Sequence, residues 1–465
     1  MVHSADTAAP RGMAPGPVGK GSGVAKSSNP RRAAVAFLLL GALTGCGTRL
    51  PASAFSQAAA SPANVFIDGV SATQIKVGMI DSITSALGVD AFSGPGYGAR
   101  AFFDALNAAG GVNGRKVVVD QCDDSGSGLG NEQCVHKLID TDHVFAFAGN
   151  SILEYAGAAY VSSHDVPDIG GQPIGQAYDQ YPHLYAIYGS DEPRQGTVGW
   201  NGRLYGGTEV YEYFKQRLGA HVAAVVAYNQ PDSVRFAQYT AAGLRAAGYT
   251  VVNEQVDFAL PNFAATASDL KARGVQVVFD AIDTSGNGRL CAAIDQVGLN
   301  LIAKVTTVQS WDQTVASTYS GAPRCRNVLY ATSSDLSYAD TKYPPVAAFR
   351  AAMQKYFPDR QDKLSMWELE GWASAQWLTD AIASCGASVS RACVEQFMNR
   401  PQKYDAHGLI LPTDFVVSQP KATQNGCLNV ARWQDSAEGG KGGWVTQVPD
   451  MTTNCFTGPV ISYAP

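Results

Sequence analysis

The chain has 465 residues, of which 46% are hydrophobic and 16% charged, and its net charge is −6. This length predicts two or three domains, with enough apolar side chains to fill their cores. No segment is rich in lysine and arginine. Nucleic acid is therefore not an expected partner, because binding it requires a basic face.

The N-terminal segment has the features of an export signal. Arg31 and Arg32 precede an apolar run from Ala33 to Leu43. A basic segment followed by about 7–15 apolar residues is typical of a secretory signal, whereas a membrane-spanning helix needs about 20. The run is too short to span, and no later stretch qualifies. The paired arginines leave twin-arginine export open beside the general secretory route, and Met13 or a later residue is an alternative start.

The end of the apolar run predicts a lipid anchor. Leu43-Thr44-Gly45-Cys46 resembles the bacterial lipobox, whose cysteine is alkylated with diacylglycerol and becomes the mature N-terminus. The alternative is an ordinary signal peptide with a chance cysteine. We expect residues 1–46 to be a signal peptide with Cys46 lipidated, and residues 47–72 to be a flexible tether. The body would then lie at the outer face of the cell membrane.

The remaining cysteines are consistent with export. Eight are left once Cys46 is set aside, and eight cysteines allow 105 connectivities. Pairing in chain order is favoured because each pair then lies within one local segment. The alternative is a metal site, but no C-x-x-C occurs and no histidine has ligand spacing, so no metal is expected. The expected disulfides are Cys122–Cys134, Cys291–Cys325, Cys385–Cys393 and Cys427–Cys455.

From Thr73 onward, short apolar runs alternate with segments of helical periodicity. The first set of predicted strands is 75–80, 117–119, 144–148 and 166–169, with helices at 96–109, 132–140 and 151–163. The second set of strands is 222–227, 250–256, 275–280, 303–308 and 327–331, with helices at 197–218, 234–247, 264–273 and 287–297. Two further helices, 345–357 and 366–384, and a turn-rich tail follow. This alternation predicts two α/β units with parallel sheets covered on both faces.

Several segments of the first unit resemble the type 1 periplasmic binding proteins, of the branched-chain amino-acid kind. Residues 107–114, Asn-Ala-Ala-Gly-Gly-Val-Asn-Gly, match the family's "N-x-x-G-G-[VI]-x-G" turn. Residues 119–124 resemble its acidic strand end, 145–151 its "v-x-G-x-x-S" loop, and 166–167 its "g-[VI]-P" strand start. Consecutive glycines also end a helix in any α/β protein, so the turn speaks more to fold than to function.

The resemblance implies two doubly wound lobes joined by three crossing strands. We expect an N-terminal lobe of residues 73–192 and 332–408, and a C-terminal lobe of residues 193–331 and 409–465. Candidate hinges lie near 189–196, 329–333 and 406–412, and closing them would trap a ligand between the lobes. A membrane permease of the ABC type is the implied partner, and we expect a monomer without a cofactor.

In such α/β lobes a ligand lies at the carboxyl ends of the strands, near helix N-termini. By resemblance, the loops at 150–151 and 170–172 would hold an anionic or carbonyl group, although Ser151 could instead be a helix cap. The second lobe would close with aromatic and polar side chains. The expected ligand contacts are Asp81, Asn150, Ser151, Gly171, Gln172, Tyr228, Ser233, Asp283, Gln309 and Trp311.

The ligand is less well indicated than the fold. Amino-acid binders of the family place a carboxylate near 309–311 for the α-ammonium group, and this chain has Gln309 and Ser310 there. A buried ammonium without a carboxylate is costly. Asp283 or Glu368 could substitute, or Trp311, Tyr228 and Trp367 could instead pack an apolar or aromatic solute. Aromatic side chains are, however, more often part of a core than of a cleft.

An enzyme is not expected, because neither G-x-S-x-G nor H-E-x-x-H occurs, and the glycine-rich 126–130 does not pass from a strand directly into a helix as a dinucleotide-binding fingerprint should. We expect an exported solute-binding lipoprotein for ABC-type uptake of a small polar or amino-acid-like ligand. A ligand-sensing receptor lipoprotein that signals to a membrane partner is the alternative, with an exported hydrolase a distant third.

Overall fold

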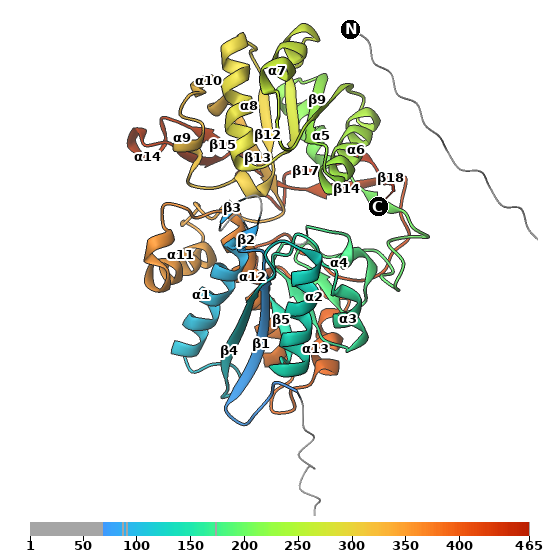
Figure 1. Ribbon diagram of the computed structural model, residues 1–465, viewed down its shortest axis with the longest axis vertical. Helices are drawn as coiled ribbons and strands as arrows, with labels where there is room; N and C mark the ends of the chain where they lie inside the picture. The colour runs from blue at the N-terminus through green and yellow to red at the C-terminus, as the bar shows by residue number, and fades with distance from the viewer. Residues whose placement is uncertain (1–67, 86–87, 90–91, 173, 465) are drawn as a thin grey trace, which may run out of the picture. The chain divides into compact units, whose positions relative to one another are not determined.

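The computed structural model describes residues 68–85, 88–89, 92–172 and 174–464 (Figure 1). The expected signal peptide, Cys46 and most of the expected tether lie outside the described residues. Within the described part of the chain, no helix is long and apolar enough to cross a membrane.

The first sheet is parallel and carries helices on both faces. Its strands, in the order β4-β1-β5-β6-β7, are Lys116–Asp123, Gln74–Asp81, Ala146–Ala148, Asp168–Gly170 and Leu184–Ala186. Val77 and Met79 of β1 belong to a core shared with α1 (Gly94–Ala108) and α12 (Met366–Ser384). Ile80 belongs to a separate core with α2 (Gly128–His136) and α3 (Ala158–Ser163). Alternating side chains of one strand therefore serve two helical layers, as a doubly wound sheet requires.

The same unit contains further helices besides the short 3-10 turns Pro358–Arg360 and Ala406–Gly408. They are α4 (Ala177–Gln180), α11 (Pro344–Tyr356), α13 (Arg391–Met398) and the π-helical turn Lys137–Thr141. Helices α11, α12 and α13 come from the far end of the chain, and Figure 1 shows α11 and α12 beside α1 in the same layer.

The second sheet has seven strands in the order β10-β9-β11-β12-β13-β15-β16. The first five are parallel and span Thr250–Val256, Val222–Tyr228, Val277–Ala281, Ala303–Thr306 and Leu329–Ser333. Strands β15 (Asn429–Gln434) and β16 (Gly443–Thr446) are antiparallel and extend the β13 edge, so the tail contributes strands as well as turns. The helices are α5 (Glu209–Leu218), α6 (Pro231–Ala246), α7 (Phe263–Ala272) and α8 (Thr284–Val297).

Short elements complete the second unit. They are β8 (Leu204–Gly206), α9 (Val315–Thr318), α10 (Pro323–Arg326), β14 (Thr423–Cys427), α14 (Ala437–Gly440), β17 (Cys455–Pro459) and β18 (Ile461–Tyr463). Strand β18 pairs with β8, and β14 pairs with β17.

Two predicted helices begin later than expected. The helix predicted at 197–218 begins at Glu209, because Gly199 and Gly202 adopt positive φ angles of 56° and 77° and the following residues form β8. The helix predicted at 151–163 begins at Ala158. Ser151 instead bridges to Asp81 and Gln172, prolonging the sheet beyond β5. In both cases pairing with distant strands prevails over local helical periodicity.

All four expected disulfides are present and confirm the pairing in chain order. Cys122–Cys134 joins β4 to α2, Cys291–Cys325 joins α8 to α10, and Cys427–Cys455 joins β14 to β17. Cys385–Cys393 connects the end of α12 to α13.

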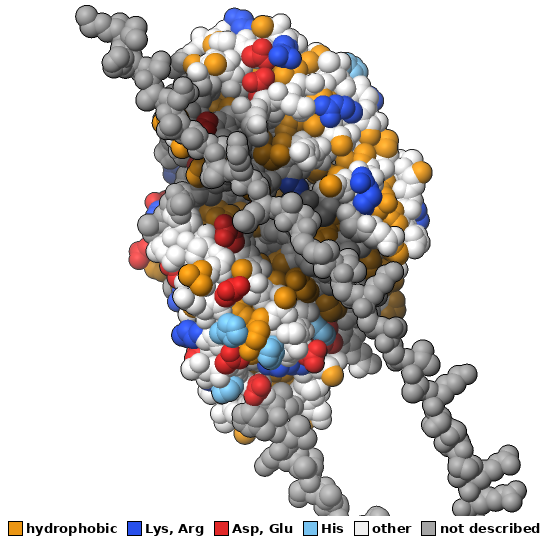
Figure 2. All heavy atoms as spheres, turned by 45° about the vertical axis from the view of Figure 1, so that its right-hand side comes forward, with side chains coloured by type: hydrophobic (Ala, Val, Ile, Leu, Met, Phe, Trp, Pro, Cys, Tyr) orange, Lys and Arg blue, Asp and Glu red, His pale blue; other side chains and the backbone are white. Residues whose placement is uncertain are grey.

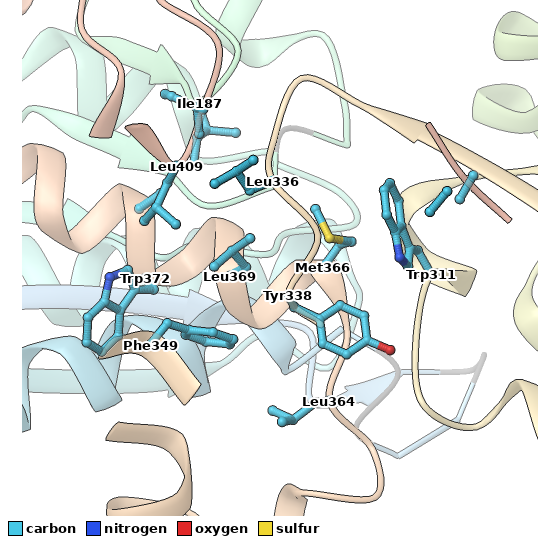
Figure 3. Close-up of a cluster of buried hydrophobic side chains, with 14 of the residues drawn as sticks. Ile187, Trp311, Leu336, Tyr338, Phe349, Leu364, Met366, Leu369, Trp372 and Leu409 are labelled. Carbon is cyan, nitrogen blue, oxygen red and sulfur yellow. The ribbon is translucent and has the colours of Figure 1, made fainter. Parts of the chain in front are cut away.

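The chain passes between the two sheets three times, after β7, after β13 and before β14. The crossing segments bind one another through their backbones: Leu336 N–H donates to Leu409 O at 2.8 Å, and Ser190 N–H donates to Asp414 O at 3.0 Å. Each segment also contributes one buried aliphatic side chain to the same core, which Figure 3 shows as Ile187, Leu336 and Leu409 near Leu369 of α12. The three crossings thus form one packed, hydrogen-bonded junction.

Candidate functional site

A cavity of about 970 Å³ is lined by side chains from both sheet units. Gln172 follows β6 and Tyr188 follows β7, while Tyr228 ends β9 and Asp283 follows β11. The carboxyl ends of parallel strands from both units therefore face one space, where ligands of open α/β sheets bind. A space of this size is within the range for small-molecule sites.

Five of the ten expected ligand contacts line this cavity: Gln172, Tyr228, Ser233, Asp283 and Gln309. The other five, Asp81, Asn150, Ser151, Gly171 and Trp311, are buried and do not line it. The structure thus brings together mainly the residues expected from the second unit.

Asp81 lies beneath the first turn of α1. A methyl group added to Gly96 would lie 2.3 Å from Asp81 Oδ2, so this helix covers the carboxylate directly. Asp81 Oδ2 accepts a 2.7 Å hydrogen bond from Gln121, and desolvation by burial raises the pKa of Asp81 well above its usual value. Gly171 is packed in the same region, where an added methyl group would meet Pro95 at 2.8 Å.

Asn150 organises the loop after β5 and has no surface toward the cavity. Its Oδ1 accepts the Ile80 amide at 2.8 Å, and its Nδ2 donates to Asp168 at 3.0 Å. Asp168 also accepts from Tyr155 at 2.7 Å and Tyr178 at 3.0 Å. Burial nevertheless raises the pKa of Asp168 to about 6. Ser151, next in the chain, is fully buried, and its hydroxyl has no hydrogen-bond partner among the described residues.

Tyr228 and Asp283 form a polar pair on the second wall. The Tyr228 hydroxyl donates to Asp283 Oδ1, and Asp283 also accepts the backbone amides of Ser285 and Gly286, both at 3.1 Å. Asp283 is thus the N-cap of α8. The amides expected to face a ligand at this helix end already have a carboxylate partner, which leaves less capacity for a ligand anion.

Trp311 belongs to the core. Its side chain is fully buried, its ring centroid lies 5.7 Å from that of Trp444, and Figure 3 shows it beside Met366. The Trp311 carbonyl accepts the amide of Met366 at 3.0 Å, which fixes this loop against the start of α12. Gln309, two residues earlier, lies in the cavity wall.

Two acidic residues, Asp335 and Glu370, lie at the junction of the crossing segments. Tyr188 donates to Glu370 Oε1 at 2.7 Å, and its hydroxyl oxygen also lies 3.1 Å from Gln172 Oε1. Glu370 is buried, and desolvation raises its pKa well above the usual value, with Asp335 as the next cause. Burial also raises the pKa of Asp335 to about 6. Tyr188 therefore connects a cavity residue of the first unit to the acidic pair at the junction.

Other lining residues were not predicted. They include Phe92, Glu154, Ile174, Glu209, Tyr211, Arg235, Phe236, Tyr239, Thr240, Phe279 and Tyr463. Arg235 and Tyr239 are one turn apart on α6, a spacing that places them on one helix face. That spacing was visible in the sequence, but which face of α6 meets the cavity depends on the tertiary structure. Tyr463 comes from β18, near the end of the chain.

The cavity wall is acidic. Its charged residues are Glu154, Glu209, Asp232, Arg235, Asp280 and Asp283, so Arg235 is the one basic side chain among the described lining residues. These described residues include no histidine. On the face drawn in Figure 2, the lysine and arginine side chains of the described residues are scattered and form no continuous basic patch. The wall is thus suited to holding a neutral or cationic group.

Two α/β sheets, three crossings and a cavity between the sheet ends define a two-lobed solute-binding protein. The sequence profile of the family described as "Periplasmic binding protein" matches residues 74–441. The chain belongs to this family, which confirms the resemblance and the α/β two-lobe fold expected from the sequence. Its members bind small-molecule ligands outside the cytoplasm and work with ABC-type permeases.

Three similar proteins differ widely from this chain in sequence. An "Amino acid binding protein" of Pseudomonas aeruginosa is 24% identical over 347 residues, which is 71% of this chain and 86% of that protein. The crystal structure of the leucine-binding protein LivK from Thermotoga maritima has a TM-score of 0.61 at 15% identity, covering 81% of this chain and 99% of that one. A fatty acid ABC transporter substrate-binding protein from Thermomonospora curvata gives 0.60 at 15%, covering 82% and 93%. These likenesses show the fold.

Proposed function

We propose that this protein is the substrate-binding lipoprotein of an ABC-type uptake system and captures a small ligand between its two lobes. The observation that carries the proposal is the 970 Å³ cavity, whose walls come from the strand ends of both sheets. Disulfides and the N-terminal apolar run fit an exported protein, and Cys46 follows that run where a lipid would be attached.

The lobes of the proposed mechanism are residues 73–192 with 332–408, and residues 193–331 with 409–465. Gln172, Tyr228, Ser233, Asp283 and Gln309 are proposed ligand contacts, since all five line the cavity. Asp81, Asn150, Ser151, Gly171 and Trp311 are proposed to hold the cavity loops in place. Closure would bend the three crossings, because each of the four disulfides lies within one lobe and none joins the two.

A binding and closure experiment tests this function. The full chain is screened by thermal shift against amino acids, amides, polyamines, quaternary ammonium compounds and carboxylates, and each hit is measured by calorimetry. Small-angle scattering with and without the hit reports closure. We expect at least one hit that raises the melting temperature and lowers the radius of gyration. Stabilisation by no solute class, together with unchanged scattering, would contradict the proposal.

The lipid anchor has its own test. Expression of the wild-type chain and Cys46→Ser in a bacterium supplied with a labelled fatty acid should label only the wild type. Equal labelling of both, or of neither, would count against lipidation at Cys46.

A further inference from the structure

One end of the cavity extends away from the predicted contact loops, between α5, α6 and the end of the second sheet. This end, called the tyrosine end here, is lined by Gly207, Glu209, Val210, Tyr211, Tyr239, Thr240, Phe279, Leu428 and Tyr463. Three phenol rings and one carboxylate therefore line the same end of the cavity.

The carboxylate of Glu209 is the unusual feature of this wall. Its Oε2 atom is buried and accepts no hydrogen bond from any described residue. A methyl group added to Gly426 would lie 2.7 Å from that oxygen, and one added to Gly207 would lie 2.2 Å from it. The two glycines thus leave room for the side chain against the backbone. Glu209 as a residue is only half-buried, but a buried carboxylate oxygen without a donor is unfavourable, and a cation that reaches it would supply the missing partner.

The three tyrosines line the same end of the cavity. Tyr239 and Tyr463 have ring centroids 4.5 Å apart, and Tyr211 packs edge-on against Phe279 at 5.3 Å. The Tyr239 hydroxyl donates to Gly207 O at 3.2 Å, which fixes its ring near Glu209. Burial raises the pKa of all three phenols, and Glu209 is a further cause for Tyr211 and Tyr239. The rings therefore remain neutral, and neutral aromatic rings attract cations.

The other carboxylates of the cavity have partners. Asp283 holds Tyr228 and the first turn of α8, and Asp280 is paired with the buried Lys304. Glu154 accepts the amide of Gly128 at 2.9 Å. Glu368, the other substitute considered from the sequence, is paired with Arg360 at 2.9 Å. Among the described lining residues, Glu209 is therefore the carboxylate that has a buried oxygen without a hydrogen-bond partner.

We propose that the tyrosine end is an ammonium subsite, in which Glu209 pairs with the cationic nitrogen of the ligand and Tyr211, Tyr239 and Tyr463 contact its methyl or methylene groups. This inference deepens the proposed function by naming the ligand class: organic ammonium compounds. An ammonium group supplies a positive charge to pair with the Glu209 carboxylate. Its polarised C–H groups are the kind that aromatic rings bind.

Arg235 favours a ligand that also has a carboxylate. Its guanidinium lies 3.4 Å from Asp232 and donates to Ile174 O at 3.3 Å, both weak contacts. Because Arg235 precedes Tyr239 by one helical turn, it stands beside the tyrosine end. It is placed to pair with a carboxylate a few bonds from the ammonium nitrogen, which favours zwitterions over simple cations.

The test measures affinity of the full chain for choline, glycine betaine and hexanoate by calorimetry. We expect choline and glycine betaine to bind, with glycine betaine tighter, and hexanoate to bind at least tenfold more weakly than either. Glu209→Gln keeps the shape and removes the charge, so it should weaken both ammonium compounds at least tenfold. Arg235→Gln should weaken glycine betaine alone.

Glu212→Gln is the matched control. It makes the same change one turn further along α5, where the carboxylate accepts from Gln216 and does not line the cavity. Affinities of this variant should stay within twofold of wild type. Circular dichroism checks that each variant is folded, and the charge-retaining Glu209→Asp, which should recover part of the affinity, separates the charge from the side chain's structural role.

Two results would overturn the subsite. The first is tighter binding of hexanoate than of both ammonium compounds. The second is ammonium binding that Glu209→Gln leaves within twofold of wild type. In either case the protein still binds a solute, so the proposed function stands. Binding of no compound, here or in the broader screen, overturns both proposals together.

Discussion

A methyl group added to Gly98 of α1 would lie 1.7 Å from the backbone carbonyl oxygen of Glu368 on α12, so the two helices touch backbone to backbone. Gly371 makes the reciprocal approach, with Pro95 O at 1.9 Å from such a methyl group. The two glycines let α12, from late in the chain, pack against the first helix of the fold. This contact holds the N-terminal lobe together and places Trp367 in the cavity wall.

Gly98→Ala should therefore destabilise the protein. Overpacking a close contact costs about 1–3 kcal/mol and sometimes more, and here the obstruction is backbone, which cannot rotate away. Urea unfolding of the variant measures the loss. Gly321→Ala is the control, because nothing lies within 4 Å of its added methyl group. Equal stability of Gly98→Ala and Gly321→Ala would show that the helices separate at no cost.

Stability should fall as the pH rises from about 4 to 8. Burial raises the pKa of Asp312 and of Glu192 to about 7 and that of Asp335 to about 6, whereas unfolded carboxyls titrate near 4. Between these values the folded state binds more protons than the unfolded state, so raising the pH favours unfolding. The contribution is complete below pH about 4 and is lost once the pH passes about 7.

Asp312→Asn isolates one of these groups. Each pKa unit is worth about 1.4 kcal/mol, so removing this group should flatten the stability profile by about 3–4 kcal/mol across that interval. Denaturant titrations of wild type and variant at pH 5, 6, 7 and 8 give the difference. A difference that does not change with pH would contradict the assignment. Acids with lowered pKa, such as Asp123 and Asp435, act in the opposite direction and only at lower pH.

Lys304→Met should lower the stability of the C-terminal lobe. Lys304 is fully buried and donates to Asp280 and, at 2.6 Å, to Asn287, while Asn287 donates to Asp280 at 2.9 Å. Removing the cation leaves an uncompensated carboxylate in the core, which costs about 3–5 kcal/mol. The double variant Lys304→Met, Asp280→Asn should recover a large part of that loss in thermal unfolding. A double variant no more stable than the single one would show that the loss is due to packing.

The disulfides should differ in their contributions to stability. In the chain-entropy model, the 34-residue separation of Cys291–Cys325 contributes about 4 kcal/mol and the 8-residue separation of Cys385–Cys393 about 2.5 kcal/mol. Replacing each pair by alanine should therefore lower the free energy of unfolding more for the first. Cys291 and Cys325 are also buried, which adds to that loss. The reverse order in urea unfolding would contradict the model.

Much of the fold could be predicted because its signals are local. The strand expected at 75–80 is found at Gln74–Asp81, and the helix expected at 366–384 is found at Met366–Ser384. Cysteine pairing in chain order held for the same reason, since each bond closes a short loop. The prediction that a helix begins at Thr197 was wrong, because residues 204–206 form β8, which pairs with β18 from near the C-terminus.

The site was predicted less completely than the fold. The rule that ligands lie at strand carboxyl ends led to Gln172, Tyr228 and Asp283, which line the cavity. The same rule could not show that α1 covers Asp81, because that depends on how closely the helix approaches the sheet. Glu209 carried no signal at all, since a glutamate in the first turn of a helix is usually exposed.

What the sequence determined by itself was the order of strands and helices, the disulfide partners and the family, because hydrophobic periodicity, glycine turns and loop closure act over short stretches of chain. What only the tertiary structure decided was which polar groups are buried without partners. The Oε2 atom of Glu209 is buried beside Gly426, which comes from much later in the chain. Burial is a property of the packed chain, and it is burial that gives an ordinary carboxylate its need for a charged ligand.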